Sequence, residues 1–214
     1  MREVLKINGV IVVLLCCLLS IGLEAKTLDR PDAVTSDDYA VYLAAMEKVV
    51  GGGSYVVLDT TTIHGEPDKL DKALSFPIED ADRITADLIE DFKFKNRKPQ
   101  TIARPFPFEA RVTFITEKER SAMFAGCIGE IKCGWKTFYD KYPGAPGITR
   151  LSRVGFNQKR DTALVYIGHV RHWEAGEGMY LFLAKTSGKW KVTSRTRGWI
   201  ASTSNGPLGK PLAQ

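Results

Sequence analysis

Four apolar segments with short connections form the C-terminal part of the chain and constrain the fold more than any other feature. Each segment is rich in the β-branched and aromatic residues that are typical of β-strands. The segments cover residues 148–156, 162–170, 179–185 and 190–200. Short polar or glycine-containing connections join antiparallel neighbours, because parallel strands need a crossover of about a dozen residues or more. We therefore expect an antiparallel β-meander in this part of the chain.

Apolar residues at helical spacing precede the meander. They recur every three or four residues after Ser36, which we expect to cap a helix that ends at Gly51–Gly53. Further helices are expected over residues 85–95 and 117–125, and strands over residues 54–62 and 110–116. These elements predict an α+β fold in which the antiparallel meander packs against N-terminal helices.

The first 25 residues have the layout of a secretory signal peptide. Arg2 and Lys6 precede an uncharged, mostly apolar run over residues 9–23, and Ala25 offers a small residue for cleavage. The run is shorter than the ~20 residues that cross a bilayer comfortably. We therefore predict a signal peptide over residues 1–25, and we predict that residues 26–214 are a single α+β domain that is secreted or periplasmic and has no integral membrane span. An uncleaved anchor is the alternative.

Cysteine usage is consistent with export. Cys16 and Cys17 lie in the expected signal peptide, where lipid modification is a further alternative to simple cleavage. Cys127 and Cys133 remain, and in an oxidising compartment we expect them to form one disulfide bond. Their spacing is not CxxC, and the segment has no histidine, but buried thiols and a redox or metal role stay open as alternatives.

The positive charge of the chain indicates which partners to expect. The net charge is +5, and loss of the signal peptide leaves it unchanged. Residues at period two in a strand share one face, so we expect Lys189, Lys191, Arg195 and Arg197 to form a basic face. In an exported protein such a face suits an anionic envelope polymer or an acidic protein. No nucleic-acid reader motif is recognisable, so nucleic acid is not an expected partner.

Two groups of residues are candidates for chemistry. His169, His172 and Glu174 are potential zinc ligands, although their spacing is awkward for a strand. Asp59 and His64 lie close together in the sequence, at the end of an expected strand. As a pair they could act as the general base of a hydrolase. Neither group matches a known catalytic motif, and no cofactor is expected.

A set of short motifs resembles a known family. Residues 152–157 read SRVGFN, residues 162–166 read TALVY, and residues 188–192 read GKWKV. Over residues 148–193 the chain resembles a family of secreted bacterial proteins that has no established activity, so the resemblance assigns no catalytic residue. The order of helices followed by a meander is also similar to that of cystatin-like and NTF2-like folds.

These observations favour one function and leave a second open. We expect a secreted or periplasmic, non-enzymatic binding module for an envelope component or a protein partner. The alternative is a hydrolase with a cleft lined by histidine and aspartate, with or without a metal ion.

Overall fold

The computed structural model describes most of the chain that follows the expected signal peptide. The described residues are 34–50, 55–63, 69–75, 77–79, 81–102, 111–125, 131–172 and 174–201. All of them belong to the compact unit Asp32–Gln214. The signal-peptide prediction therefore lies outside the described residues. No helix in these ranges is long and apolar enough to cross a membrane.

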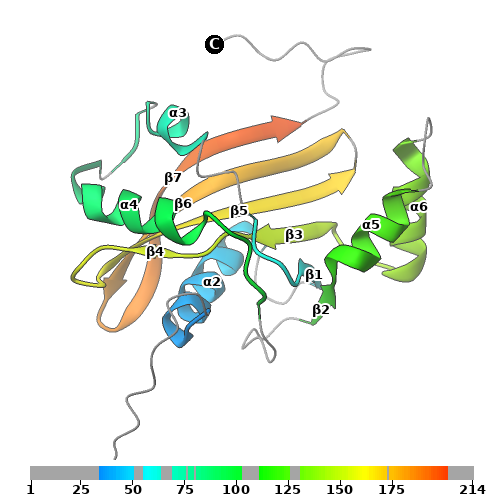
Figure 1. Cartoon of the computed structure of the whole chain (residues 1–214), viewed down its shortest axis with the longest axis horizontal. Coiled ribbons are helices and arrows are strands. Elements are labelled where there is room, and N and C mark those ends of the chain that lie inside the picture. The colour runs from blue at the N-terminus through cyan, green and yellow to red at the C-terminus, as the bar shows by residue number, and fades with distance from the viewer. Residues whose placement is uncertain are drawn as a thin grey trace, which may run out of the picture. The chain divides into compact units, whose positions relative to one another are not determined.

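The fold is α+β, as the sequence predicts (Figure 1). The helices are α2 (Ser36–Val49), α3 (Leu70–Leu74), α4 (Ala86–Lys95), α5 (Glu117–Ala125) and α6 (Ile131–Lys141), with a 3-10 helix η2 (Ala81–Arg83). The strands are β1 (Val56–Asp59), β2 (Val112–Ile115), β3 (Ile148–Leu151), β4 (Gly155–Phe156), β5 (Thr162–His172), β6 (Ala175–Thr186) and β7 (Lys189–Ala201).

The seven strands form one mixed sheet, in the order β2-β1-β3-β5-β6-β7, with β4 also paired to β5. The expected antiparallel meander is present from β3 to β7. At the other end the sheet is mixed, because β1 runs parallel to both β2 and β3. The physical reason is that the chain from β1 to β2, and from β2 to β3, is long enough to carry helices, and such crossovers permit parallel pairing.

The expected strand over residues 148–156 is interrupted, and β3 and β4 both pair with β5. Between them, the hydroxyl of Ser152 accepts a hydrogen bond from the Tyr166 amide at 2.8 Å, where a backbone partner would stand in an unbroken ladder. The amide of Ser152 still donates to the Tyr166 carbonyl at 2.9 Å. The chain therefore departs from the ladder after Ser152 without leaving the buried Tyr166 amide unpaired.

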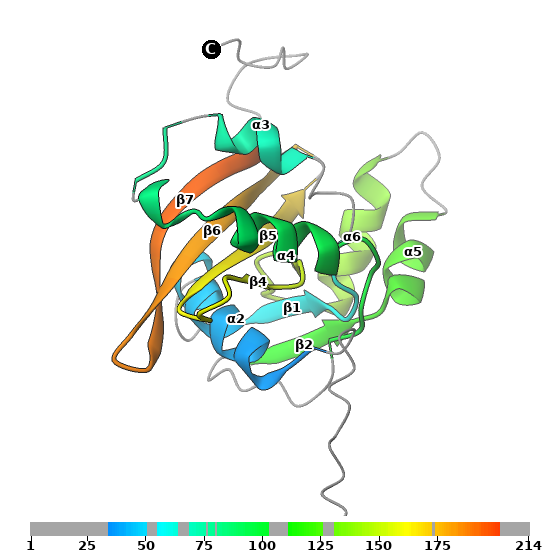
Figure 2. The same cartoon turned by 60° about the vertical axis from the view of Figure 1, so that its left-hand side comes forward.

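Three apolar clusters cover the two faces of the sheet. On one face, which we call the α2 face, α2 packs through Val41, Tyr42, Ala45 and Met46 against inward residues of β1, β5, β6 and β7. On the opposite face, which we call the α4 face, α3 and α4 cover β5–β7, while α5 and α6 cover β1–β3. Figure 2 shows α4 crossing in front of the central strands, with α5 and α6 to one side. Two separate helical layers on the α4 face leave part of the sheet between them.

Helix α2 starts one position earlier than the sequence suggests. The N-cap is Thr35 rather than Ser36: Thr35 and Asp38 form a reciprocal capping box, in which the Asp38 carboxylate accepts hydrogen bonds from the amide and hydroxyl of Thr35. Helices α4 and α5 agree with the sequence-based ranges to within one residue. Helix α6, which contains Cys133, has no counterpart among the elements that the sequence predicts.

A buried ion pair connects α2 to segment 152–154. Arg153 is only 2% exposed and Asp38 only 1%, and Arg153 Nε lies 3.9 Å from Asp38 Oδ1. On the other side of the same segment, the Asn96 side chain donates to the Arg153 carbonyl and accepts from the Arg153 amide. Buried charges are costly unless they are paired and hydrogen-bonded, so separation of Arg153 from Asp38 is unfavourable. Through this pair and through Asn96, segment 152–154 fixes α2 and the end of α4 to the sheet.

Candidate functional site

Asp59, the first catalytic candidate, is a buried ion-pair partner. It is 0% exposed at the end of β1, and its Oδ2 lies 3.2 Å from Arg120 Nε and 3.4 Å from Arg150 Nε. Its Oδ1 accepts a hydrogen bond from the amide of Thr61 at 2.9 Å. The Asp59 carboxylate is therefore already occupied by two guanidinium groups and a backbone amide. His64, its proposed partner, lies outside the described residues.

His169, the first metal candidate, lies on the other face of the sheet. Thr149 is paired with Leu58 on β1 and with His169 on β5, so His169 shares the α2 face with Leu58 while Asp59 is on the α4 face. Its Nδ1 is 3.0 Å from the hydroxyl of Thr149, and burial lowers its pKa below the ordinary histidine value. The structure therefore does not bring Asp59 and His169 together.

The remaining metal candidates do not complete a site within the part of the chain that the structure describes. His172 ends β5, and Glu174 occupies the turn before β6. No group of three or more histidine, cysteine, aspartate or glutamate side chains placed to hold a metal ion occurs among the described residues. Glu177, the next carboxylate along the chain, forms an ion pair with Arg171 at 3.2 Å.

The expected basic face is divided between two faces of the sheet, which corrects the period-two prediction. The pairing of β6 with β7 shifts between Phe182 and Leu183, so that Thr193 is an extra residue in β7. Directly opposed residues of an antiparallel pair point to the same side. Lys191 opposes Ala184 on the α4 face, whereas Arg195 opposes Leu181 on the α2 face. A single bulge residue reverses the alternation that sequence spacing assumes.

The four cations nevertheless all lie on one strand. Lys189, Lys191, Arg195 and Arg197 are each exposed. None forms an ion pair with a carboxylate of the residues that the structure describes. Strand β7 stands at the end of the strand order, so its second edge has no strand partner among the described residues. The lysines and arginines therefore flank one edge of the sheet from its two sides.

The disulfide prediction cannot be followed to both cysteines. Cys133 lies in the first half of α6, and Cys127 lies outside the described residues. Around Cys133, α6 packs against α5 so closely that a Cβ at Gly134 would stand 2.3 Å from the Phe124 ring. The Cys127–Cys133 bond stays a prediction.

A small pocket that the sequence analysis did not anticipate lies on the α4 face. Its volume is about 310 Å³, and we call it the Arg150 pocket. It is lined by Ile63, Lys69, Arg150, Tyr166, Gly168, Val170 and Trp199. Ile63, Tyr166 and Trp199 belong to the cluster under α3 and α4, whereas Val170 packs against the cluster under α5 and α6. The pocket therefore lies between the two helical layers of this face.

Two glycines of β6 allow the aromatic side of this pocket to form. A Cβ at Gly178 would stand 1.9 Å from the Tyr166 hydroxyl and 2.3 Å from Trp199 Nε1, and a Cβ at Gly176 would stand 2.9 Å from the Trp199 ring. The indole of Trp199 therefore lies directly on the β6 backbone, and its Nε1 donates a hydrogen bond to the Tyr166 hydroxyl at 2.5 Å. Glycine inside a strand is a sequence signal of such a close approach.

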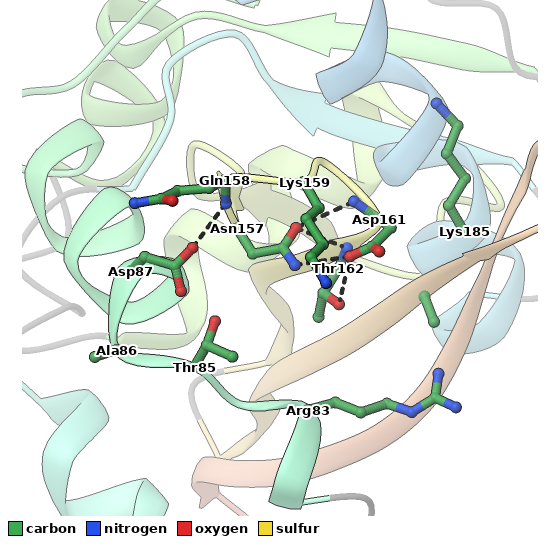
Figure 3. A pocket seen from close by; sticks show the side chains of 11 residues that line it. Arg83, Thr85, Ala86, Asp87, Asn157, Gln158, Lys159, Asp161, Thr162 and Lys185 are labelled. Carbon is green, nitrogen blue, oxygen red and sulfur yellow. Dashed lines mark hydrogen bonds between the residues drawn. The ribbon is translucent and has the colours of Figure 1, made fainter.

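Two larger hollows lie on either side of the turn between β4 and β5. The first, of about 660 Å³, is shown in Figure 3. Its acidic groups already have donors: Asp87 accepts from the Gln158 amide at 2.7 Å, and Asp161 accepts from the Asn157 side chain at 2.7 Å. Hydrogen bonds from Thr85 and Gln158 hold the pKa of Asp87 below its usual range. The second hollow, of about 740 Å³, borders Phe94 and the basic end of α4. Both mix charges of either sign, unlike the Arg150 pocket.

Comparison with known proteins adds no assignment. No protein-family model, curated protein or solved structure matches the chain.

Proposed function

We propose that the protein is an exported, non-enzymatic binding protein that recognises an anionic polymer of the cell envelope along the β7 edge. The observation that carries this proposal is the set of four exposed cations on β7, none of which pairs with a described carboxylate. Elsewhere on the surface, cations such as Lys93 and Arg160 form ion pairs with aspartates at 2.7 Å. The signal-peptide layout of residues 1–25 and the resemblance to secreted bacterial proteins support export.

The arrangement on β7 favours a linear partner over a flat one. The lysines lie on the α4 face and the arginines on the α2 face, so a bilayer surface pressed against either face would meet one pair only. A chain lying along the free edge of β7 can reach both pairs. From Lys189 to Arg197 the strand extends roughly 25 Å, at ~3.3 Å per residue. That length suits several successive negative charges of an extended polyanion.

Cations on an edge strand also have a structural use, since they discourage pairing with the edge of another sheet. The two uses differ in what they require. Protection of the edge requires charge of either sign, whereas recognition of a polyanion requires positive charge. Charge reversal at the four positions should therefore abolish polymer binding and leave the oligomeric state unchanged.

The experiment measures binding of polyphosphate, as a soluble linear polyanion, to the mature chain at several salt concentrations. We expect Lys189→Gln/Lys191→Gln and Arg195→Gln/Arg197→Gln each to weaken binding and to reduce the salt dependence by roughly one to two released counterions. The matched control is Lys98→Gln/Lys118→Gln, which removes two exposed cations from other elements. An equal loss in this control would refute the proposal, because general charge would then explain binding.

A second probe separates the polymer from a membrane. Vesicles that contain anionic phospholipid present a flat array of negative charge. If the mature chain binds such vesicles and not polyphosphate, and if only one of the two pairs matters, the linear-polymer proposal is wrong and a membrane surface is the partner.

A further inference from the structure

The Arg150 pocket carries an inference that is independent of the β7 edge. We propose that it binds a small aromatic carboxylate, which places its carboxylate on the guanidinium of Arg150 and its ring against Trp199. Four features of the pocket favour this ligand: the charge of the lining, the way Arg150 is held, the aromatic wall and the volume.

Among the residues that the structure describes, the lining has cationic groups and no acidic one. Arg150 and Lys69 are the charged residues of this described lining, and its other side chains are apolar or aromatic, apart from Gly168. Asp59 and Glu117 both pair with Arg120, and neither is among the described lining residues. The charged side chains of the described lining are therefore positive, which favours an anion.

Arg150 is held at one end and available at the other. Its Nε lies 3.4 Å from Oδ2 of the fully buried Asp59, which is itself fixed by Arg120 and by the amide of Thr61. The Nε hydrogen has no hydrogen-bond partner, and the terminal nitrogens of Arg150 form no hydrogen bond with the described residues. The Arg150 side chain is 31% exposed, so a ligand can reach it. A guanidinium held in this way presents a planar pair of donors that matches a carboxylate.

Trp199 and Tyr166 give the pocket a rigid aromatic wall. The Trp199 ring rests on Gly176 and Gly178, and its N–H is already used by the Tyr166 hydroxyl. The wall therefore offers the ligand apolar and π surface rather than a free donor from the indole. Aromatic rings that pack on such a wall gain about 0.5–1.5 kcal/mol beyond the area they bury.

The volume limits the size of the ligand. At about 310 Å³, the pocket is near the lower end of the ~300–1,000 Å³ range of ligand sites. It has room for one ring with a short acidic group. A phosphate dianion fits the lining less well, because apolar walls on most sides would leave part of its charge without a partner.

The test is titration of the mature chain with benzoate, followed by the indole N–H signal of Trp199 in NMR spectra and by calorimetry. Trp199→Phe assigns that signal. We expect saturable binding of benzoate with a Kd of about 1 mM or below, and at least roughly tenfold weaker binding of benzyl alcohol, acetate and inorganic phosphate. Benzyl alcohol lacks the charge, acetate lacks the ring, and phosphate represents an anion site without an aromatic preference.

Variants locate the binding. Arg150→Gln should weaken benzoate at least about tenfold, because a charge-assisted hydrogen bond is lost; Arg120 remains to pair with Asp59 in this variant. Arg195→Gln is the control, and it should lower polyphosphate affinity while leaving benzoate binding unchanged. The two proposals can therefore fail separately.

A second variant keeps the test decisive if Arg150→Gln does not fold. Gly168→Ala adds a methyl group to the pocket lining, and its Cβ would meet its nearest neighbours at an ordinary 3.5 Å. It should fold and should weaken benzoate by filling space. Absence of benzoate binding at about 10 mM, full affinity in both variants, or equal affinity for acetate or phosphate would each overturn the proposal.

Discussion

The buried pair of Asp38 and Arg153 allows the most quantitative prediction. Both side chains are at most 2% exposed, and no solvent can take over the charge of either if its partner is removed. Asp38→Ala leaves the guanidinium of Arg153 buried without this carboxylate, which costs about 3–5 kcal/mol in comparable cases. The same change removes the carboxylate of the capping box at the start of α2, worth about 1 kcal/mol. We therefore expect a loss of about 4–6 kcal/mol.

The assay is urea unfolding of the mature chain, followed by tryptophan fluorescence and far-ultraviolet circular dichroism. The free energy of unfolding of a domain of this kind is about 5–15 kcal/mol. The Asp38→Ala variant should therefore be largely unfolded without urea, or its urea midpoint should be much lower than that of the parent. The control is Asp37→Ala, one residue earlier, which removes a half-exposed partner of Arg160 and should cost no more than about 1 kcal/mol.

A double-variant cycle tests the cause. Arg153→Met alone leaves Asp38 buried without its partner, whereas Asp38→Ala with Arg153→Met leaves no buried charge at either of these two positions. The double variant should therefore lose at least about 2 kcal/mol less than the sum of the two single variants. Losses that simply add, or a single loss under about 1 kcal/mol, would show that the pair is not buried as described.

Three further predictions concern other parts of the fold. Gly178→Ala should destabilise the protein by about 1–3 kcal/mol in urea, because its Cβ would overlap the Tyr166 hydroxyl at 1.9 Å; a stability equal to that of the parent would refute the close packing. The pKa of Glu119 is lowered from 4.5 to about 2. The largest cause is a hydrogen bond from the backbone amide of Thr116, and the Thr116 hydroxyl and the ammonium group of Lys141 lower it further. The stability that this carboxylate supplies is present above pH 4.5 and is lost as the pH falls towards 2, so Glu119→Gln should flatten the dependence of unfolding free energy on pH in that window. Thiol titration of the unfolded, unreduced mature chain should find no reactive cysteine at Cys127 or Cys133, and two after reduction; two reactive thiols beforehand would exclude the disulfide.

Local patterns predict the elements whose partners are close in the chain. The strands from β3 to β7 follow one another with short connections, so their β-branched content and turns were enough to predict an antiparallel arrangement. Helices α4 and α5 follow the same rule, since their ends are marked by local residues. The parallel pairing of β1 with β2 and β3 depends on where two helical crossovers return the chain, and no local pattern records that.

The candidate site shows the same limit more sharply. Asp59 was selected for its position at a strand end, but its role depends on Arg120, which is 61 residues away in the chain. Arg150 and Trp199 were not selected, because neither stands in a motif, and only the sheet register brings them to one pocket. Of the glycines at 168, 176 and 178, only Gly168 falls in an expected strand, because the structure extends β6 back to Ala175. Glycine inside a strand indicates a close approach of bulky side chains, but for Gly176 and Gly178 that signal needs the strand to be recognised first.

The extra residue in β7 has a consequence for how the strand tolerates change in length. Val192 and Ser194 flank Thr193 and already occupy opposite faces, as neighbours in an unbroken strand do. Loss of Thr193 would therefore remove the bulge and keep every other side chain on its present face of the sheet. An inserted residue next to Thr193 would require a wider bulge, or it would move Arg195 and Arg197 to the opposite face. Sequences that differ in length by one residue at this point can thus share one pattern of inner and outer side chains, even though their spacing along the chain disagrees.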